Sequence, residues 1–225
     1  MLKNNKNYDW KKQRRLGYLE RREFRYYIFC EGQKTEPLYF ERLKELIEKS
    51  PIYRDMVLVR IEPCVGETLY ILDQAKKYVL KNNITNSHMW CVYDKDDFPA
   101  ERFDLVERTI EELNQKPENG VYFHAAWSNQ CIEFWFILHF SFYHSNTNRK
   151  AYMEHLDKRF KEIGYEKYQK NMKETFDILQ TYGNIDNAIK YAKKIISDND
   201  GKKPSEIAPG TKVYELVEEL RKYIL

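Results

Sequence analysis

The chain has 225 residues, and its 42% hydrophobic and 15% aromatic content is enough for the core of one domain, with or without an appendage. A formal net charge of +3 is too small to indicate or exclude a nucleic-acid partner. The four cysteines are isolated from one another, which argues against a disulfide framework or a Cys-x-x-Cys zinc site: Cys30, Cys64, Cys91 and Cys131. The sequence shows no signal-peptide pattern and no apolar run of bilayer length, so we expect a cytoplasmic protein with no membrane partner.

The first 26 residues are basic, with aromatic side chains between the charges. They hold nine Lys or Arg residues against three Asp or Glu residues. Such an arm, which we place at residues 1–23, can neutralise backbone phosphates. The candidate nucleic-acid contacts in it are Arg14, Arg15, Arg21 and Arg22. A solvated N-terminal segment without a ligand is an equal alternative.

Residues 24–140 alternate between β-rich and helical patterns. The expected strands are 25–32, 56–64, 88–94 and 121–128, and the expected helices are 35–50, 66–83, 100–116 and a buried helix at 131–140. This alternation predicts a parallel α/β sheet with right-handed crossovers. The strands are almost continuously apolar, as is typical of a sheet that helices cover on both faces.

The pattern changes after residue 140. Residues 141–225 show no further strand, and helices are expected at 149–164, 172–180, 184–199 and 211–225. We therefore expect an α-helical C-terminal region packed on the α/β core. Aromatic residues in these helices fit packing within the chain, and a homodimer surface is the alternative: Tyr165, Tyr168, Phe176 and Tyr182.

Carboxylates follow three of the four expected strands. In an open parallel sheet, ligand sites form beyond the carboxyl ends of the strands. Residues from distant parts of the sequence should therefore meet at one edge: Glu31, Glu36, Asp94, Asp96, Asp97 and Glu133.

Asp94 and Asp96 are two positions apart, a spacing that points both side chains to one side of an extended backbone. With Glu31 they make an oxygen-only set that suits Mg2+ or Mn2+. Glu36, Asp97 or Glu133 would support a second ion. Such ions orient a phosphate and stabilise the charge of an in-line displacement, and Glu31 is also a candidate general acid or base.

Each of these residues also has a structural interpretation. Asp-x-Asp is common in surface loops, and Asp97 is also a candidate helix cap. A carboxylate such as Glu133, inside an apolar segment, needs a partner, which is either a basic side chain or the site. Lys34 and Lys95 lie beside the acidic set and are either phosphate contacts or solvated lysines. No Walker or Gly-x-Gly-x-x-Gly motif is present, which argues against an NTPase or dinucleotide enzyme.

Four segments in order resemble the RloB-like family, a Toprim-related group of bacterial defence proteins: FCEGQKTEPLYFERL, VYDKDDF, SNQCIEFWFILHF and APGTKVYELVEEL. The last segment matches approximately, and Asn129-Gln130 stands where the family pattern has Asn-Pro. The resemblance implies a Toprim-like domain over 24–140, with Glu31, Asp94 and Asp96 as its catalytic carboxylates. A more distant resemblance to the overcoming-lysogenization-defect nucleases implies two metals, with Glu36 and Glu133 as supporting residues.

The resemblance also implies a function. The implied function is that of a Mg2+- or Mn2+-dependent nuclease that hydrolyses phosphodiester bonds of DNA or RNA, with tRNA among the candidate substrates. The setting would be phage defence by abortive infection, often beside a companion ATPase that can hold the nuclease silent. The alternative is a non-catalytic effector that binds nucleic acid or a partner protein and is regulated by that ATPase.

Overall fold

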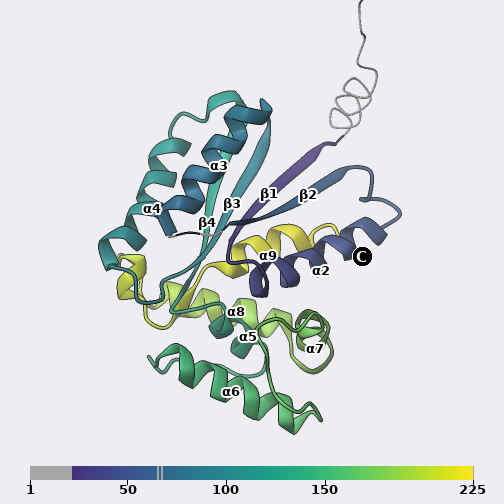
Figure 1. Ribbon diagram of the computed structural model, residues 1–225, viewed down its shortest axis with the longest axis vertical. Helices are drawn as coiled ribbons and strands as arrows, with labels where there is room; N and C mark the ends of the chain where they lie inside the picture. The colour runs from purple at the N-terminus through teal and green to yellow at the C-terminus, as the bar shows by residue number, and fades with distance from the viewer. Residues whose placement is uncertain (1–21, 65, 67, 225) are drawn as a thin grey trace, which may run out of the picture.

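The computed structural model describes residues 22–64, 66 and 68–224. In this part of the chain a five-stranded sheet has the order β2-β1-β3-β4-β5 (Figure 1). Strands β1 to β4 run parallel to one another, and β5 runs antiparallel to β4. The parallel α/β sheet predicted from the sequence is therefore confirmed. The strands are β1 (Phe24–Glu31), β2 (Val57–Cys64), β3 (Ser87–Asp94), β4 (Val121–Asn129) and β5 (Gly210–Thr211).

Three helices connect the parallel strands, as the alternating pattern predicts: α2 (Thr35–Lys49), α3 (Thr68–Asn82) and α4 (Ala100–Asn114). After β4 come α5 (Glu133–Leu138), α6 (Arg149–Glu162), α7 (Thr175–Tyr182), α8 (Ile185–Ser197) and α9 (Val213–Arg221). The short 3₁₀ helices η1 (Glu118–Gly120) and η2 (Pro204–Glu206) precede β4 and β5. None of the described helices is long and apolar enough to cross a bilayer.

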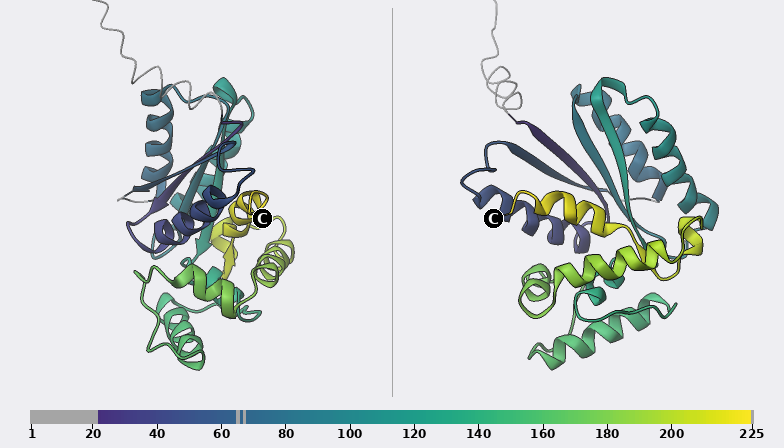
Figure 2. Two further views of the ribbon diagram at one scale, coloured as in Figure 1. Left: turned by 90° about the vertical axis from the view of Figure 1, so that its right-hand side faces the viewer. Right: turned by 180° about the vertical axis from the view of Figure 1, so that it is seen from behind.

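Helices cover the two faces of the sheet in pairs. α3 and α4 lie on one face, while α2 and α9, from opposite ends of the described chain, lie side by side on the other (Figures 1 and 2). Alternate residues of β1 show this division. The ring of Phe29 packs edge-on against Tyr78 of α3, whereas the hydroxyl of Tyr26 donates to Glu219 of α9 at 2.8 Å. Burial on both sides explains why the strands carry so few polar residues.

Helices α5 to α8 gather at the carboxyl ends of the parallel strands, with α6 outermost (Figure 1). Short α5 anchors them, because all six of its residues are buried. The indole of Trp135 donates a hydrogen bond of 3.0 Å to the hydroxyl of Tyr39 in α2. This arrangement brings the helical region next to the sheet edge where the carboxylates were expected. The four cysteines are free, as their isolation in the sequence predicts, and all four are buried.

The prediction that residues 141–225 contain no strand is wrong. Gly210 and Thr211 form β5, which pairs antiparallel with Asn129 and Ser128 at the end of β4, and α9 begins only at Val213. The hydroxyl of Thr211 also donates to the carbonyl of Trp127 at 3.1 Å. A strand of two residues has no periodicity to detect, and its conformation depends on a partner far away in the sequence.

Candidate metal and phosphate site

A pocket of about 380 Å³ opens at the carboxyl ends of β1 and β3. This is the sheet edge at which ligands bind in open α/β folds. Four carboxylates and three basic side chains line it: Glu31, Glu36, Asp94, Asp96, Lys34, Arg149 and Lys170. The predicted convergence of Glu31, Asp94 and Asp96 on one place in the fold is therefore observed.

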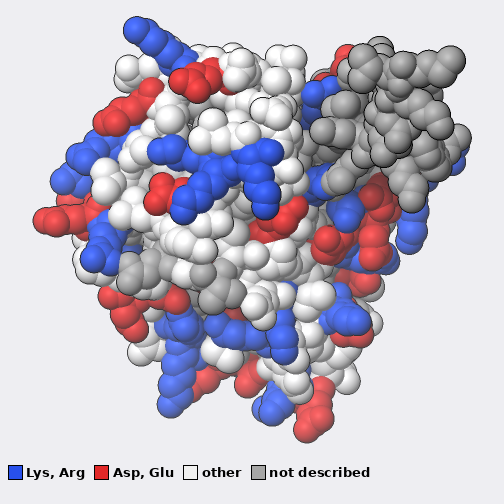
Figure 3. Space-filling view, turned by 45° about the horizontal axis from the view of Figure 1, so that its top comes forward, with Lys and Arg blue, Asp and Glu red and all other residues white. Residues whose placement is uncertain are grey.

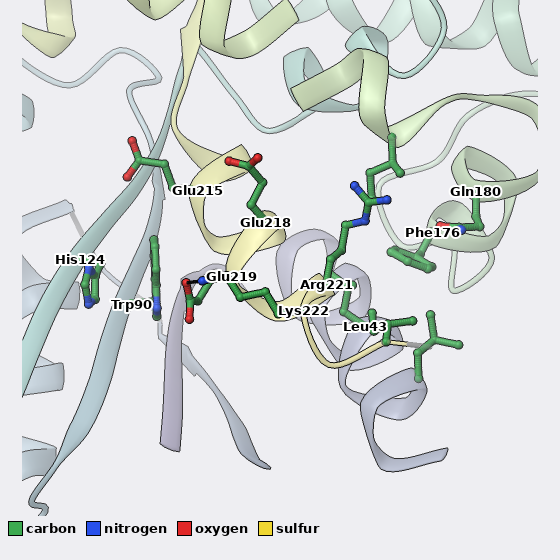
Figure 4. A pocket seen from close by; sticks show the side chains of 13 residues that line it. Leu43, Trp90, His124, Phe176, Gln180, Glu215, Glu218, Glu219, Arg221 and Lys222 are labelled. Atoms are coloured by element: carbon green, nitrogen blue, oxygen red, sulfur yellow. Dashed lines mark hydrogen bonds and ion pairs between the residues drawn. The ribbon is translucent and has the colours of Figure 1, made fainter. Parts of the chain in front are cut away.

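A larger groove of about 790 Å³ lies elsewhere, around α9 (Figure 4). None of the six predicted carboxylates lines this groove. Two of its own carboxylates already have ion-pair partners, since Glu218 pairs with Lys193 at 2.7 Å and Glu219 with Lys222 at 2.5 Å. We therefore place the candidate site in the smaller pocket.

Parallel strand pairing joins Glu31 and Asp94. Cys30 of β1 lies in register with Val92 of β3, so both strands end at the same level. The main-chain N–H of Asp94 donates to Glu31 Oε2 at 3.0 Å. One oxygen of Glu31 is thus held by the backbone, and the carboxylate lies beside that of Asp94 at the pocket.

The carboxylates of the pocket are partly or fully withdrawn from water, and their charges repel. Burial raises the pKa of Asp94 well above its usual range, and the charges of Glu36, Glu133 and Glu31 add to this rise. Burial is also the main cause that raises the pKa of Glu36 to about 8, with Glu133 and Glu31 adding to it. The pKa of Glu31 is raised by burial, against the opposing effects of the Asp94 N–H and Arg149. Mutually repelling buried carboxylates of this kind are typical of functional sites.

Glu133 is fully buried and does not itself line the pocket. Its Oε1 accepts a hydrogen bond of 3.2 Å from the hydroxyl of Tyr168 and lies 3.6 Å from the ammonium of Lys170. Its Oε2 has no hydrogen-bond partner among the described residues. A buried carboxylate oxygen without a partner is energetically costly. Of the two interpretations from the sequence, pairing with a basic side chain is therefore observed: Glu133 pairs with Lys170, and it is Lys170 that lines the pocket.

Asp96 reaches the pocket in a different way from the one its spacing predicts. β3 ends at Asp94, and Asp96 has a left-handed backbone with φ of 43°. The extended geometry assumed for residues 94–96 is therefore wrong. The N–H of Asp96 donates to the carbonyl of Gln130 at 3.0 Å, and its carboxylate forms an ion pair with Arg149.

The donor set suits a hard divalent cation, because all of its ligand atoms are carboxylate oxygens. In their present positions, however, no three Asp, Glu, His or Cys side chains of the described residues are grouped to hold a metal ion. Two of the candidate ligands are engaged by basic side chains, Asp96 by Arg149 and Glu133 by Lys170. The chemistry of the residues fits Mg2+ or Mn2+, and Asp96 and Glu133 would have to leave their basic partners to bind such an ion.

Asp97 and Lys95 do not line the pocket. Asp97 is exposed, and it does not cap α4, because Pro99 occupies the N-cap position without a side-chain hydrogen bond. The ammonium of Lys95 donates to the carbonyl of Phe98. These two residues belong to the turn after β3, and the structure gives neither a ligand-binding position.

The predicted basic contacts have different surroundings. Lys34 is exposed at the pocket. Arg22 is buried and donates to the carbonyl of Val57 at 2.6 Å, which does not fit the phosphate contact predicted for it. Arg14, Arg15 and Arg21 lie outside the described residues. On the face drawn in Figure 3, a group of Lys and Arg side chains lies near the centre with Asp and Glu side chains at its edges.

Sequence reasoning missed Arg149, Lys170 and Tyr168. All three come from the C-terminal helical region, more than a hundred residues after Glu31. Each stands among other charged or aromatic residues in its own segment, so no local pattern distinguishes it. Only the folded arrangement of the C-terminal region, in which α6 packs on α5, brings these residues to the carboxylates.

The geometry can now be set beside known proteins. A family model described as RloB-like protein matches residues 26–220, which is nearly the whole chain. The matched range includes every residue that lines the pocket. No curated protein and no solved structure matches the chain. The family match agrees with the four resembling segments, and the chain therefore belongs to the RloB-like family.

Proposed function

We propose that this protein is a divalent-cation-dependent phosphodiesterase that hydrolyses nucleic acid, with Mg2+ or Mn2+ as its cofactor. One observation carries the proposal. Buried, mutually repelling carboxylates share a pocket with three basic side chains at the carboxyl edge of a parallel sheet. Carboxylates suit the cation, and basic side chains suit the phosphate.

Glu31, Glu36 and Asp94 would hold the first cation, because none of them is occupied by an ion pair in the described part of the chain. Asp96 and Glu133 would add oxygens after leaving Arg149 and Lys170. When bound, such a cation orients the phosphate and stabilises the charge that develops during displacement.

Glu31 is the proposed general acid or base. Its Oε2 accepts the Asp94 N–H, which leaves Oε1 either to bind the cation or to hold and release a proton. A raised pKa brings a carboxyl group closer to neutral pH, where proton transfer is effective. Lys34, Arg149 and Lys170 would bind the phosphate oxygens and orient the diester without reading the bases.

The biological setting is proposed from the resemblance to the RloB-like family described above. We propose a cytoplasmic role in phage defence by abortive infection, with a companion ATPase as regulator. DNA and RNA, including tRNA, are both candidate substrates, because phosphate contacts do not select between them.

A nuclease assay of the purified full chain tests this proposal. DNA, total RNA and tRNA are offered with Mg2+ or Mn2+, and Asp94→Asn is compared with the control Asp97→Asn, which removes an exposed charge outside the pocket. We expect cleavage by the wild type and the control, and a loss of at least about 100-fold in Asp94→Asn. Cleavage that persists in Asp94→Asn or in excess chelator contradicts the proposal.

The second candidate is a non-catalytic effector that binds nucleic acid or a partner protein. The ion pairs on Asp96 and Glu133 favour it, because they leave no assembled metal site among the described residues. Protection of cells against phage discriminates the two. The effector hypothesis predicts full protection by Glu31→Gln and Asp94→Asn chains, and the nuclease hypothesis predicts none.

A further inference from the structure

The C-terminal region supplies two basic side chains to a pocket whose carboxylates come from the α/β core. Arg149 is the first residue of α6, and Lys170 lies between α6 and α7. Both line the pocket. Each pairs with a different candidate metal ligand, Arg149 with Asp96 and Lys170 with Glu133.

Hydrogen bonds hold the backbones of Arg149 and Lys170 in place beside the pocket. Gln130 accepts the N–H of Asp96 with its carbonyl at 3.0 Å, and its side-chain oxygen accepts the N–H of Arg149 at 3.1 Å. Gln130 thereby sets the spacing between the two members of the ion pair. The carbonyl of Lys170 accepts the hydroxyl of Thr35 at 2.7 Å, which ties its segment to the start of α2.

The side-chain ends have more freedom than these backbones. The side chains of Arg149 and Lys170 are 40% and 42% exposed, whereas that of Glu133 is 1% exposed. Both are long and reach the carboxylates from the solvent side. Their charged ends can therefore leave the carboxylates for the open side of the pocket while α6 and the backbone stay in place.

A divalent cation and these side chains compete for the same oxygens. Without a cation, the guanidinium and the ammonium neutralise Asp96 and Glu133. A bound cation is the largest local charge and repels both side chains from those carboxylates. The displaced groups then face the open pocket, where a planar guanidinium pairs well with phosphate oxygens.

We propose that Arg149 and Lys170 are exchangeable counter-ions. They hold Asp96 and Glu133 while the pocket lacks a divalent cation, and they turn to the backbone phosphates of the nucleic acid when the cation is bound. This inference rests on the proposed function. It assigns to the C-terminal helical region both the restraint of the metal ligands and the positioning of the substrate.

The inference predicts opposite effects on two ligands. Arg149→Gln frees Asp96 from its competitor and should strengthen Mn2+ binding about fivefold, the equivalent of one exposed ion pair. The same change removes a phosphate contact and should weaken nucleic-acid binding about tenfold. A merely structural role for Arg149 would weaken both or neither.

Two measurements test the inference. Calorimetry of the full chain titrated with Mn2+ gives the affinity for the cation. Fluorescence anisotropy of labelled single-stranded DNA and RNA gives the affinity for nucleic acid, with Ca2+ present to slow cleavage. Lys150→Gln is the matched control, because it removes the same charge from the same helix. Among the described residues, Lys150 pairs with Glu154 alone, at 3.8 Å on the surface. Neither affinity should change in the control. Arg149→Lys keeps the charge and should lie between the wild type and Arg149→Gln.

Lys170→Gln provides a second variant and should shift the two affinities in the same opposite directions. If the wild type binds Mn2+ and the Arg149→Gln chain binds it equally or more weakly, this inference is overturned and the proposed function is unaffected. Failure of both chains to bind Mn2+ overturns the proposed function as well. Circular dichroism of each variant confirms that the chain is folded.

Discussion

The main-chain N–H of Asp94 donates a hydrogen bond of 3.0 Å to Glu31 Oε2, joining the ends of β3 and β1 at the candidate site. The two oxygens of the Glu31 carboxylate therefore have different roles. One oxygen positions the strand ends, and the other is left for proton transfer or metal binding. Structure and chemistry at this residue can therefore be separated by mutation.

Glu31→Gln should preserve the fold and abolish activity. An amide oxygen still accepts the Asp94 N–H, so the free energy of unfolding should stay within about 1 kcal/mol of wild type. The amide neither transfers a proton nor binds a hard cation well, and cleavage should fall at least about 100-fold. Glu31→Ala also leaves the N–H unpaired and should cost a further 1–3 kcal/mol, roughly. Urea unfolding of the two variants makes the comparison, and equal stability of Gln and Ala variants would contradict the structural role.

Glu133→Gln should not destabilise the metal-free protein. The substitution keeps an acceptor for the Tyr168 hydroxyl. It also removes the negative charge of a carboxylate whose Oε2 has no hydrogen-bond partner among the described residues. We expect the free energy of unfolding in chelator to stay level or rise by about 1 kcal/mol, while stabilisation by Mn2+ decreases. Thermal unfolding with and without Mn2+ measures both. A large loss of stability in chelator would show that the Glu133 charge is structural.

The metal-free protein should lose stability as the pH rises through the titration of Glu36. The folded-state pKa of about 8 exceeds the ordinary value of 4.5, so the folded state binds more protons between these pH values. Stability from this group is complete below about pH 4.5 and is lost progressively up to about pH 8. Divalent cations reverse the repulsion, and their stabilising effect should grow from pH 6 to pH 9. Glu36→Gln should flatten this dependence, which thermal unfolding at several pH values would detect.

His139 should cause the opposite trend under acid conditions. It is buried in the core, and its Nδ1 lies 3.0 Å from the carbonyl of Trp135. Burial lowers its pKa from 6.5 to about 4, so the unfolded state binds more protons below pH 6.5. Folding stability from this group should fall by about 3 kcal/mol between pH 6.5 and pH 4. The slope should be smaller in His139→Gln, measured by urea unfolding at each pH. An unchanged slope would mean that His139 is not the group responsible.

The sequence was sufficient to predict the parallel sheet and the meeting of Glu31 with Asp94. Continuous apolar strands and amphipathic helices are local properties, and the parallel pairing places strand ends together. Asp96 was assigned to the right pocket for a wrong reason, because its left-handed turn depends on the carbonyl of Gln130 beyond β4.

The remaining features depend on contacts between distant segments. β5 is too short to leave a pattern. The approach of Arg149 and Lys170 depends on the packing of α6 on α5 and on the bond between Thr35 and the backbone of Lys170. Arg22 was assigned to a basic arm by composition, yet its guanidinium binds the backbone at the start of β2. Composition alone does not separate a basic residue used in packing from one used in binding.

The central claim is that the buried carboxylates hold a divalent cation, and diffraction from crystals soaked in Mn2+ tests it most directly. We predict an anomalous peak in the pocket, about 2.0–2.3 Å from carboxylate oxygens of Glu31 and Asp94, with the guanidinium of Arg149 moved away from Asp96. A protein that cleaves nucleic acid with Mn2+ but shows no manganese in this pocket would contradict the account.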